Sequence, residues 1–339
     1  MRSGEAEDRS REESTKRPGP SGLGGIHHIT AIAGDPQRNL DFYTDVLGLR
    51  LVKLTVNFDD PGTYHFYFGN AQGTPGSILT FFPWAGVRRG TIGNGQVSAT
   101  TFAVPSGSFD YWREHLTKAQ TRIHEEGQRF GEPVLGFADP DGLPLELIET
   151  SSAHRTEQWP GSSIPANAAI CGFHSATLSE EGYEKTAALL RDVMGLQLVG
   201  NEGNRFRYQA PGNQPAALVD VICTPDRTSG RLGAGTVHHI AWRTPDDMQQ
   251  ASWRKTLVAT GYNVSPVMDR TYFHSIYYRE PGGILFEIAT DPPGFALDEP
   301  PEHLGERLML PPQVERHRAT LEPALPRLTL PHQKAALRR

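Results

Sequence analysis

Gly25-Ile-His-His-Ile-Thr30 and the following Asp45-Val-Leu-Gly-Leu-Arg-Leu-Val52 are the most informative segments of this chain, because the chain repeats both of them. They return as Gly172-Phe-His-Ser-Ala-Thr177 and Asp192-Val-Met-Gly-Leu-Gln-Leu-Val199. The distance along the chain between the two copies of the first segment equals the distance between the two copies of the second, so the copies align without a gap. Self-similarity at a fixed spacing indicates a duplicated structural unit.

A second repeat lies downstream of each copy. Phe137-Ala-Asp-Pro-Asp-Gly-Leu-Pro-Leu-Glu146 matches Tyr278-Arg-Glu-Pro-Gly-Gly-Ile-Leu-Phe-Glu287, and Val97-Ser-Ala99 matches Val237-His-His239. The chain therefore consists of four modules. Their bounds are about 24–92, 95–152, 170–225 and 235–291.

Each module begins with a short strand, continues with a helix and ends with further strands. Module 1 shows this best, with a strand expected over 27–32, a helix over 36–47, and strands over 50–56 and 64–68. The helical segment carries apolar residues at helical spacing, and Gly48 ends it. The later segments alternate apolar and polar residues, as half-buried strands do. Four such βαβββ units predict an α+β protein.

The composition of the 339-residue chain narrows its class. Gly 35 and Pro 27 indicate a turn-rich globular protein, and no apolar run is long enough for a membrane-spanning helix. The net charge of -6 offers no basic surface to nucleic acid. Two cysteines, together with a charged N-terminal segment that lacks an apolar core, predict a cytoplasmic protein.

The modules and the composition divide the chain into four regions. Residues 1–22 are expected to form a disordered tail. Modules 1 and 2 form a first domain at 23–152, and modules 3 and 4 form a second at 170–292. The remaining 293–339 is a Pro-rich tail, for which we expect one amphipathic helix from Pro311 that packs on the body.

Two His-His pairs are the first candidates for chemistry. Neighbouring side chains on a strand point to opposite faces, so only one histidine of each pair can enter a shared site. His27 has a histidine counterpart in module 3, whereas His28 is replaced there by Ser175. His239 is likewise replaced by Ala99 in module 2. A hydrogen-bonded core histidine is the simpler interpretation of any one of them, but two at equivalent positions favour a shared site.

Glu287 lies in an otherwise apolar strand, Ile284-Leu-Phe-Glu-Ile-Ala-Thr290. A buried carboxylate needs a cation, which is either a basic side chain such as Arg279 or Arg270 or a metal ion. Two neutral imidazoles and one carboxylate form the 2-His-1-carboxylate triad, which binds Fe(II) and leaves positions open for substrate and O₂. The residues that fit this triad are His28, His239 and Glu287.

Tyr277 is expected to lie beside this triad. A hairpin centred on Gly282 places Tyr277 opposite Glu287, and cross-strand partners share a face of the sheet. The hairpin therefore predicts a phenol donor next to the metal, with an ordinary strand tyrosine as the alternative.

Together these segments resemble the vicinal oxygen chelate superfamily of glyoxalases, bleomycin resistance proteins and extradiol dioxygenases. Within it, the chain is most similar to ring-cleaving dioxygenases of the hydroquinone 1,2-dioxygenase type. The resemblance covers residues 25 to about 326 and rests on the segments at 25–30, 73–76, 173–175, 203–207, 237–240 and 270–287. It implies two vicinal oxygen chelate domains, each with an open, β-barrel-like cleft.

The resemblance also implies an activity. It implies an Fe(II) site, or Mn(II) as in some relatives, between modules 1 and 4, and an enzyme that inserts both atoms of O₂ into a hydroquinone-like aromatic diol. The further site residues that it implies are Tyr277, Arg270, His27, His238 and Thr30. The expected partners are therefore a small aromatic diol and O₂, without nucleic acid or membrane, and self-association is left open.

Three alternatives are left by the sequence. A glyoxalase-type isomerase or lyase needs a fourth ligand, usually a second carboxylate, and aligning 76–81 with 282–287 puts Phe81 at that place. A non-enzymatic protein of the same fold would bind a small aromatic or drug molecule in the cleft. A metal in the other pair of modules would lack both histidines and keep only Glu146 and Asp220.

Overall fold

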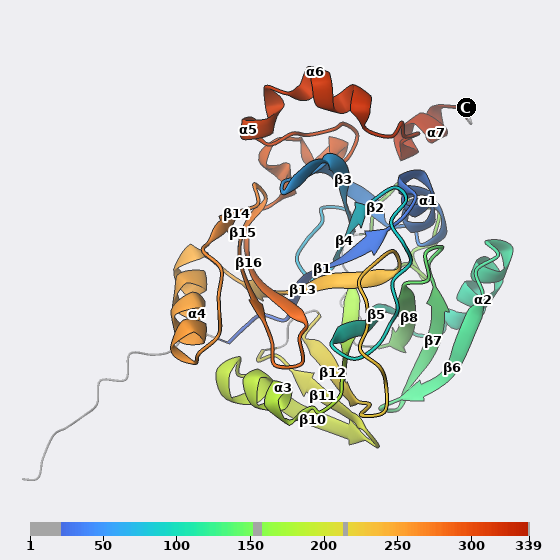
Figure 1. Ribbon diagram of the computed structural model, residues 1–339. Helices are drawn as coiled ribbons and strands as arrows, with labels where there is room; N and C mark the ends of the chain where they lie inside the picture. The colour runs from blue at the N-terminus through green and yellow to red at the C-terminus, as the bar shows by residue number, and fades with distance from the viewer. Residues whose placement is uncertain (1–21, 152–157, 213–215, 338–339) are drawn as a thin grey trace, which may run out of the picture.

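Two curled sheets of eight strands each build the protein (Figure 1). The computed structural model describes residues 22–151, 158–212 and 216–337, so the N-terminal tail expected at 1–22 lies almost wholly outside the described residues. The strands of the first sheet, in spatial order, are β14 (Met268–Asp269), β15 (Phe273–Arg279), β16 (Leu285–Pro293), β13 (Thr236–Thr244), β1 (Ile26–Ala33), β4 (Ile78–Pro83), β3 (Asp60–Gly69) and β2 (Arg50–Asn57). The strands of the second sheet are β10 (Gln197–Glu202), β11 (Arg205–Gln209), β12 (Leu218–Cys223), β9 (Phe173–Glu180), β5 (Gln96–Pro105), β8 (Pro144–Thr150), β7 (Glu132–Ala138) and β6 (Ile123–Arg129).

Each sheet combines strands from both halves of the sequence. The first sheet joins modules 1 and 4 through the antiparallel pair β1 and β13, and the second joins modules 2 and 3 through β5 and β9. Within a module the first strand runs parallel to the last, as β1 does to β4, and the other two strands lie towards the edge. The α+β class and the βαβββ unit are therefore confirmed. The division of the chain at 152 and 170 stays a prediction.

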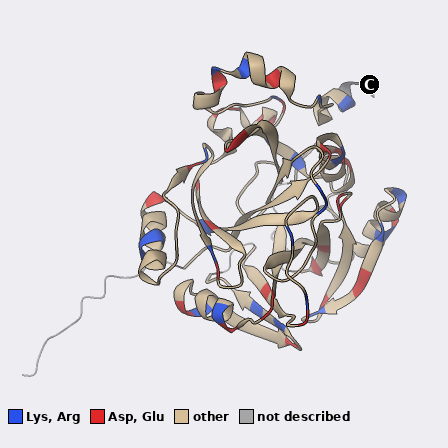
Figure 2. Cartoon of the chain, viewed as in Figure 1, with Lys and Arg blue, Asp and Glu red and all other residues tan. Residues whose placement is uncertain are grey.

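Short helices flank the sheets. They are α1 (Pro36–Asp41), continued by the π-helical turn η1 (Phe42–Val46), α2 (Phe109–Lys118), α3 (Glu184–Ala188), continued by η2 (Leu189–Val193), and α4 (Asp247–Ala259). In Figure 1, α4 lies outside β14–β16 and α2 lies outside β6 and β7. Figure 2 shows basic and acidic residues interspersed on these outer helices. No helix among the described residues has the length and hydropathy needed to cross a membrane.

Module 1 shows why the sequence forms these elements. Asp35 caps α1, because its carboxylate accepts a hydrogen bond of 2.7 Å from the amide of Arg38. Pro36 fits the first turn, where an amide hydrogen has no helical acceptor. Gly48 has a φ of 69°, a conformation that ends a helix and favours glycine. The strand, the helix and its end at Gly48 are confirmed.

The C-terminal region is divided where a single helix was expected. After β16 it forms η3 (Phe295–Leu297), η4 (Pro301–His303), α5 (Pro312–Glu315), α6 (Arg318–Leu321), η5 (Glu322–Ala324) and α7 (Pro331–Leu337). Prolines such as Pro312 and Pro323 start new turns, because a proline cannot donate the backbone hydrogen bond that continues a helix. Leu304, Leu310 and Val314 are buried, which confirms that the tail packs on the body.

This tail joins the two edges of the first sheet. Lys53 on β2 is fully buried, and its Nζ lies 2.6 Å from Oδ1 of Asp298 and 2.5 Å from Oε2 of Glu299. The hydroxyl of Tyr272, which lies between β14 and β15, donates a hydrogen bond of 2.9 Å to the other oxygen of Asp298. One carboxylate thus connects the edge at β2 with the edge at β14, and Figure 1 shows the tail running across this end of the sheet.

Replacing Lys53 by methionine tests this connection. The variant leaves Asp298 and Glu299 without their buried cation, so we expect the free energy of unfolding to fall by about 3 kcal/mol, measured by chemical denaturation. Lys334→Met is the matched control, because Lys334 binds two aspartates at the surface and should contribute less than about 1 kcal/mol. Equal losses in the two variants would contradict a structural role for Lys53.

Candidate metal centre

The three predicted metal ligands lie together on the concave side of the first sheet. Nε2 of His28 on β1 is 3.3 Å from Nε2 of His239 on β13. Oε2 of Glu287 on β16 lies 3.3 Å from the first nitrogen and 3.0 Å from the second. All three side chains are buried. Within the described part of the chain, they are the only group of three or more His, Cys, Asp or Glu side chains with ligand atoms close enough to share a metal ion.

Strand register explains why residues so distant in sequence meet. His28 pairs with Ala241 on β13, and Ala241 pairs with Glu287 on β16, so His28 and Glu287 share a face of the sheet. His239 lies two positions before Ala241 and points to the same face. The junction of modules 1 and 4 therefore assembles the triad.

A β-bulge changes the direction of the first histidine in each pair. In the pairing of β1 with β13, His27 and His238 have no partner, because the register shifts at both places. Nδ1 of His27 lies 2.9 Å from Nδ1 of His28, and Nδ1 of His238 lies 2.8 Å from Nδ1 of His239. The expectation that the two members point to opposite faces is corrected, because the bulges bring both rings together.

These contacts set the protonation of the two candidate ligands. Burial lowers the pKa of His238 to about 3 and holds the pKa of His27 well below its usual value, so both rings are neutral. Each neutral ring can accept a hydrogen bond at Nδ1, and His28 and His239 can therefore donate from Nδ1. Nε2 of each candidate ligand then faces Glu287 and is the atom that would bind a metal ion, which requires it unprotonated.

No lysine or arginine among the described residues pairs with the carboxylate of Glu287. Oε1 accepts a hydrogen bond from Ser275, whereas the buried Oε2 faces the two imidazole nitrogens. Arg270 and Arg279 bind other partners, so neither forms the salt bridge considered as an alternative. Burial raises the pKa of Glu287, but the two imidazoles outweigh it and hold the pKa well below its usual value. Two imidazole nitrogens and an ionised carboxylate fit a divalent transition metal.

Tyr277 lies opposite Glu287, so the register expected from the hairpin is confirmed. Nε of Arg270 donates a hydrogen bond of 3.1 Å to the hydroxyl of Tyr277, and Nη2 of Arg270 lies 3.2 Å from Asp59. Burial, followed by the charge of Glu287, raises the pKa of Tyr277, so the phenol keeps its proton.

A cavity of about 380 Å³, called the cleft from here on, opens beside the triad. The predicted residues in its wall are His28, His239, His238, Arg270 and Tyr277. The other wall residues are Asn57, Phe58, Asp59, Asp60, His65, Tyr67, Phe82, Trp84, Phe273 and Leu285. The wall combines many aromatic rings with polar and charged groups, which suits a small aromatic ligand that carries oxygen atoms.

Two predicted residues, His27 and Thr30, lie behind this wall. The ring of His27 packs at 5.2 Å between centroids against Phe273, which does line the cleft. Oγ1 of Thr30 lies 2.7 Å from Oγ1 of Thr80. Both residues can therefore act only through the side chains that they contact.

His65 and Tyr67 line the cleft and were absent from the predicted site. The sequence Tyr64-His-Phe-Tyr-Phe68 on β3 alternates between the two faces of the sheet. Tyr64, Phe66 and Phe68 join the hydrophobic core, whereas His65 and Tyr67 lie on the other face. This alternation predicts a strand, but the sequence does not show which face of the sheet carries the site, so it predicts no function for these two residues.

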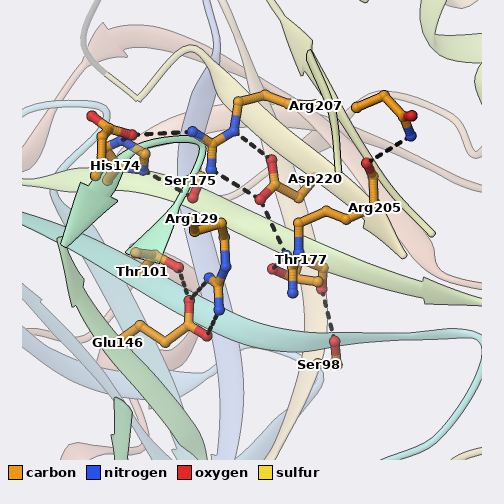
Figure 3. Close-up of polar contacts among 12 residues, drawn as sticks. Ser98, Thr101, Arg129, Glu146, His174, Ser175, Thr177, Arg205, Arg207 and Asp220 are labelled. Carbon is orange, nitrogen blue, oxygen red and sulfur yellow. Dashed lines mark hydrogen bonds and ion pairs between the residues drawn. The ribbon is translucent and has the colours of Figure 1, made fainter. Parts of the chain in front are cut away.

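The equivalent place in the second sheet holds an arginine cluster (Figure 3). Its members are Arg129, Arg205, Arg207, Glu132, Glu146 and Asp220. Arg129 binds Glu146, the repeat counterpart of Glu287, and Arg207 binds Asp220 at 2.7 Å. These carboxylates are paired with guanidinium groups, which disfavours the alternative of a metal in this pair of modules.

The repeat also explains how Arg129 reaches Glu146. Arg129 and Arg270 occupy equivalent positions, and Gly136 stands where the other module has Tyr277. Gly136 pairs with Glu146 as Tyr277 pairs with Glu287. The missing side chain therefore leaves room for a guanidinium group at the carboxylate.

Comparison with known proteins agrees with this architecture. Residues 25–147 and 172–288 match the family model of the glyoxalase/bleomycin resistance protein/dioxygenase superfamily. The chain is 53% identical over 301 residues to MhqO of Bacillus subtilis (strain 168), which is named as a ring-cleaving dioxygenase, and the match covers 89% of this chain and 95% of that protein.

Two further relatives extend the comparison. The chlorohydroquinone/hydroquinone 1,2-dioxygenase of Sphingobium indicum is 38% identical over 305 residues, covering 87% of this chain and 94% of that protein. A crystal structure described as a dioxygenase of Bacillus subtilis has a TM-score of 0.88 at 52% identity, covering 91% of this chain and 99% of that one. The chain therefore belongs to the glyoxalase/bleomycin resistance protein/dioxygenase superfamily, and within it to the ring-cleaving dioxygenases.

Proposed function

We propose that this enzyme is an Fe(II)-dependent dioxygenase that opens a hydroquinone-like aromatic diol and inserts both atoms of O₂ into the product. The buried set of His28, His239 and Glu287 in the wall of an aromatic cleft carries this proposal. The name of the Sphingobium indicum relative supports the substrate class. Mn(II) fits the same ligands. The proposal includes a cytoplasmic location, which the composition favours.

The bound metal would act as a Lewis acid for the diol and as the site at which O₂ is activated. Three protein ligands leave open positions for both reactants. The neighbouring rings of His27 and His238 would keep the two imidazole ligands in one orientation, because each accepts a hydrogen bond from its neighbour. The protein thus supplies a ligand set that is oriented by hydrogen bonds behind it.

The walls of the cleft would bind and orient the ring. His65, Phe82 and Phe273 offer aromatic faces and edges to a flat substrate. The phenol of Tyr277 is protonated and lies next to Glu287, so it can donate to an oxygen of the diol and exchange a proton with it. Arg270 holds the Tyr277 oxygen and brings a positive charge that favours an oxyanion.

The position of a fourth ligand bears on the isomerase alternative. Phe81 was expected at the place equivalent to Glu287, but Phe81 packs in the core, and the register puts Thr80 there. Thr80 pairs with Thr30 on β1 as Glu287 pairs with Ala241 on β13. A threonine is not the second carboxylate of a glyoxalase-type isomerase, so the corrected position still favours the dioxygenase.

Oxygen consumption tests the proposed function. Protein purified without oxygen and loaded with Fe(II) should consume O₂ on addition of hydroquinone or methylhydroquinone, and the product spectrum should show ring opening. Catechol serves as the comparison substrate. Bound metal without oxygen consumption would contradict the dioxygenase, and a protein that retains no metal would favour the binding protein.

The metal ligands have a direct mutational test. His28→Ala, His239→Ala and Glu287→Ala should each lose bound metal, and activity should fall by more than about a hundredfold while the fold persists, because each removes one of three ligands. Metal analysis and circular dichroism measure these outcomes. Ser175→Ala, at the counterpart of His28 in the second sheet, should change neither. An active His28→Ala enzyme would move the ligand role to His27.

Tyr277→Phe separates proton transfer from metal binding. The variant should retain its metal and lower kcat by about a hundredfold or more, because general acid-base groups contribute on this scale. Steady-state kinetics with measured metal content gives the result. Tyr278→Phe is the matched control, since Tyr278 lies on the other face of β15 with its hydroxyl against Met194. Equal kinetics in Tyr277→Phe and wild type would remove Tyr277 from catalysis.

A further inference from the structure

A chain of three hydrogen bonds runs through the wall of the cleft. The hydroxyl of Tyr67 lies 2.9 Å from Nδ1 of His65 on the same strand. Nε2 of His65 lies 2.9 Å from Oγ1 of Thr80, which lies 2.7 Å from Oγ1 of Thr30. Tyr67 and His65 line the cleft, whereas Thr80 and Thr30 are buried behind it. The chain thus connects the cleft with the interior of the sheet.

The internal symmetry of the first sheet relates this chain to the metal centre. Tyr67 pairs with Thr80 across β3 and β4, as Tyr277 pairs with Glu287 across β15 and β16. Tyr67 is therefore the module 1 counterpart of Tyr277. Both tyrosines line the cleft. Burial, followed by Tyr277, raises the pKa of Tyr67, so this phenol keeps its proton.

The ring of His65 is neutral. Burial, followed by the nearby His28 and His239, holds its pKa well below the usual value. A neutral imidazole donates from one nitrogen and accepts at the other, so the hydrogen bonds can run in one of two directions. They run either from Tyr67 towards Thr30 or from Thr30 towards Tyr67.

The buried end of the chain selects the direction. Thr30 is 1% exposed, and Thr80 is the only partner of its hydroxyl among the described residues. If Thr80 donated to Thr30, the hydrogen of the Thr30 hydroxyl would be buried without an acceptor, which is unfavourable. Thr30 therefore donates to Thr80, and Thr80 donates to Nε2 of His65.

The same direction determines what Tyr67 offers to the cleft. His65 then carries its hydrogen on Nδ1 and donates it to the oxygen of Tyr67. The chain of hydrogen bonds does not use the hydroxyl hydrogen of Tyr67. Tyr67 is only 1% exposed but, unlike Thr30, it lines the cleft, so a ligand in the cleft can accept this hydrogen. A phenol whose oxygen already accepts one hydrogen bond is a stronger donor, because neighbouring hydrogen bonds polarise each other.

We propose that Tyr67 donates a hydrogen bond to an oxygen of the aromatic substrate, and that His65, Thr80 and Thr30 are positioning residues that fix this donor. The inference rests on the proposed function, because it assigns Tyr67 to the cleft of the dioxygenase. Tyr67 and Tyr277 together place a phenol from each half of the first sheet near the substrate. Such donors bind an oxygen that carries negative charge more strongly than a neutral one. The cleft therefore selects diols that can bind as phenolates.

The tautomer of His65 tests the direction of the chain without catalysis. Full-length protein labelled with ¹⁵N-histidine and loaded with diamagnetic Zn(II) should show His65 protonated at Nδ1 and unprotonated at Nε2, with the signals assigned by their loss in His65→Gln. Protonation at Nε2 would overturn the proposal, because Tyr67 would then donate to the ring instead of the substrate.

Phenolate binding tests the donor itself. With Fe(II)-loaded protein under anaerobic conditions, Tyr67→Phe should weaken 4-nitrophenolate binding by about tenfold, measured by absorbance, because a hydrogen bond to a charged oxygen is lost. Thr80→Val should weaken binding in the same direction, and Thr80→Ser should restore it. Thr55→Val is the matched control, since Thr55 pairs with His65 across the strands and its buried hydroxyl has no hydrogen-bond partner in the described part of the chain.

The outcomes separate this inference from the proposed function. Unchanged binding in Tyr67→Phe, or equal losses in Thr80→Val and Thr55→Val, would overturn the inference while oxygen consumption by the wild-type enzyme still supports the dioxygenase. If the tautomer and the binding losses are as expected but the wild type consumes no oxygen with any diol, the donor is supported and the proposed function is contradicted.

Discussion

A carboxylate in the interior of a sheet must meet a cation, and the structure depends on how this requirement is satisfied in each half. In the second sheet, Arg129 satisfies it for Glu146 from within the chain. In the first sheet, Glu287 meets the imidazoles of His28 and His239. The same β-strand framework thus carries a closed ion pair in one sheet and the proposed metal centre in the other.

β-Bulges position the histidines of the proposed metal centre. The strand junction of the second sheet has register shifts at Ser98 and His174, the counterparts of His238 and His27. The bulges therefore belong to the duplicated framework and not to the metal centre alone. In the first sheet, histidines occupy each bulge and the residue that follows it. They form two hydrogen-bonded pairs of rings, His27 with His28 and His238 with His239. A small set of side chains thus specialises one sheet without altering its backbone plan.

Much of the site could be predicted because the chain contains repeated modules whose sequences can be compared with one another. Differences between repeats identified His28 and His239, and the hairpin placed Tyr277. Thr80 was missed because the sequence alignment put Phe81 there, and one position on a strand changes the face that a side chain occupies. Tyr67 was missed because the sequence comparison did not align β3 with β15, where its counterpart Tyr277 lies. The division of the tail depends on prolines that interrupt a weak helical pattern.

The arginine cluster has a consequence for what each half of the chain needs from its surroundings. The second sheet is complete as soon as the chain folds, because its cations are part of the polypeptide. The ion pairs of that half need no metal, and the first half is joined to it through the main chain and through backbone hydrogen bonds such as that from Phe173 to Gly76. The two halves of the duplicated chain therefore differ in what they need from outside: the second sheet carries its cations in the polypeptide, whereas the proposed metal centre of the first sheet would depend on metal from the cell.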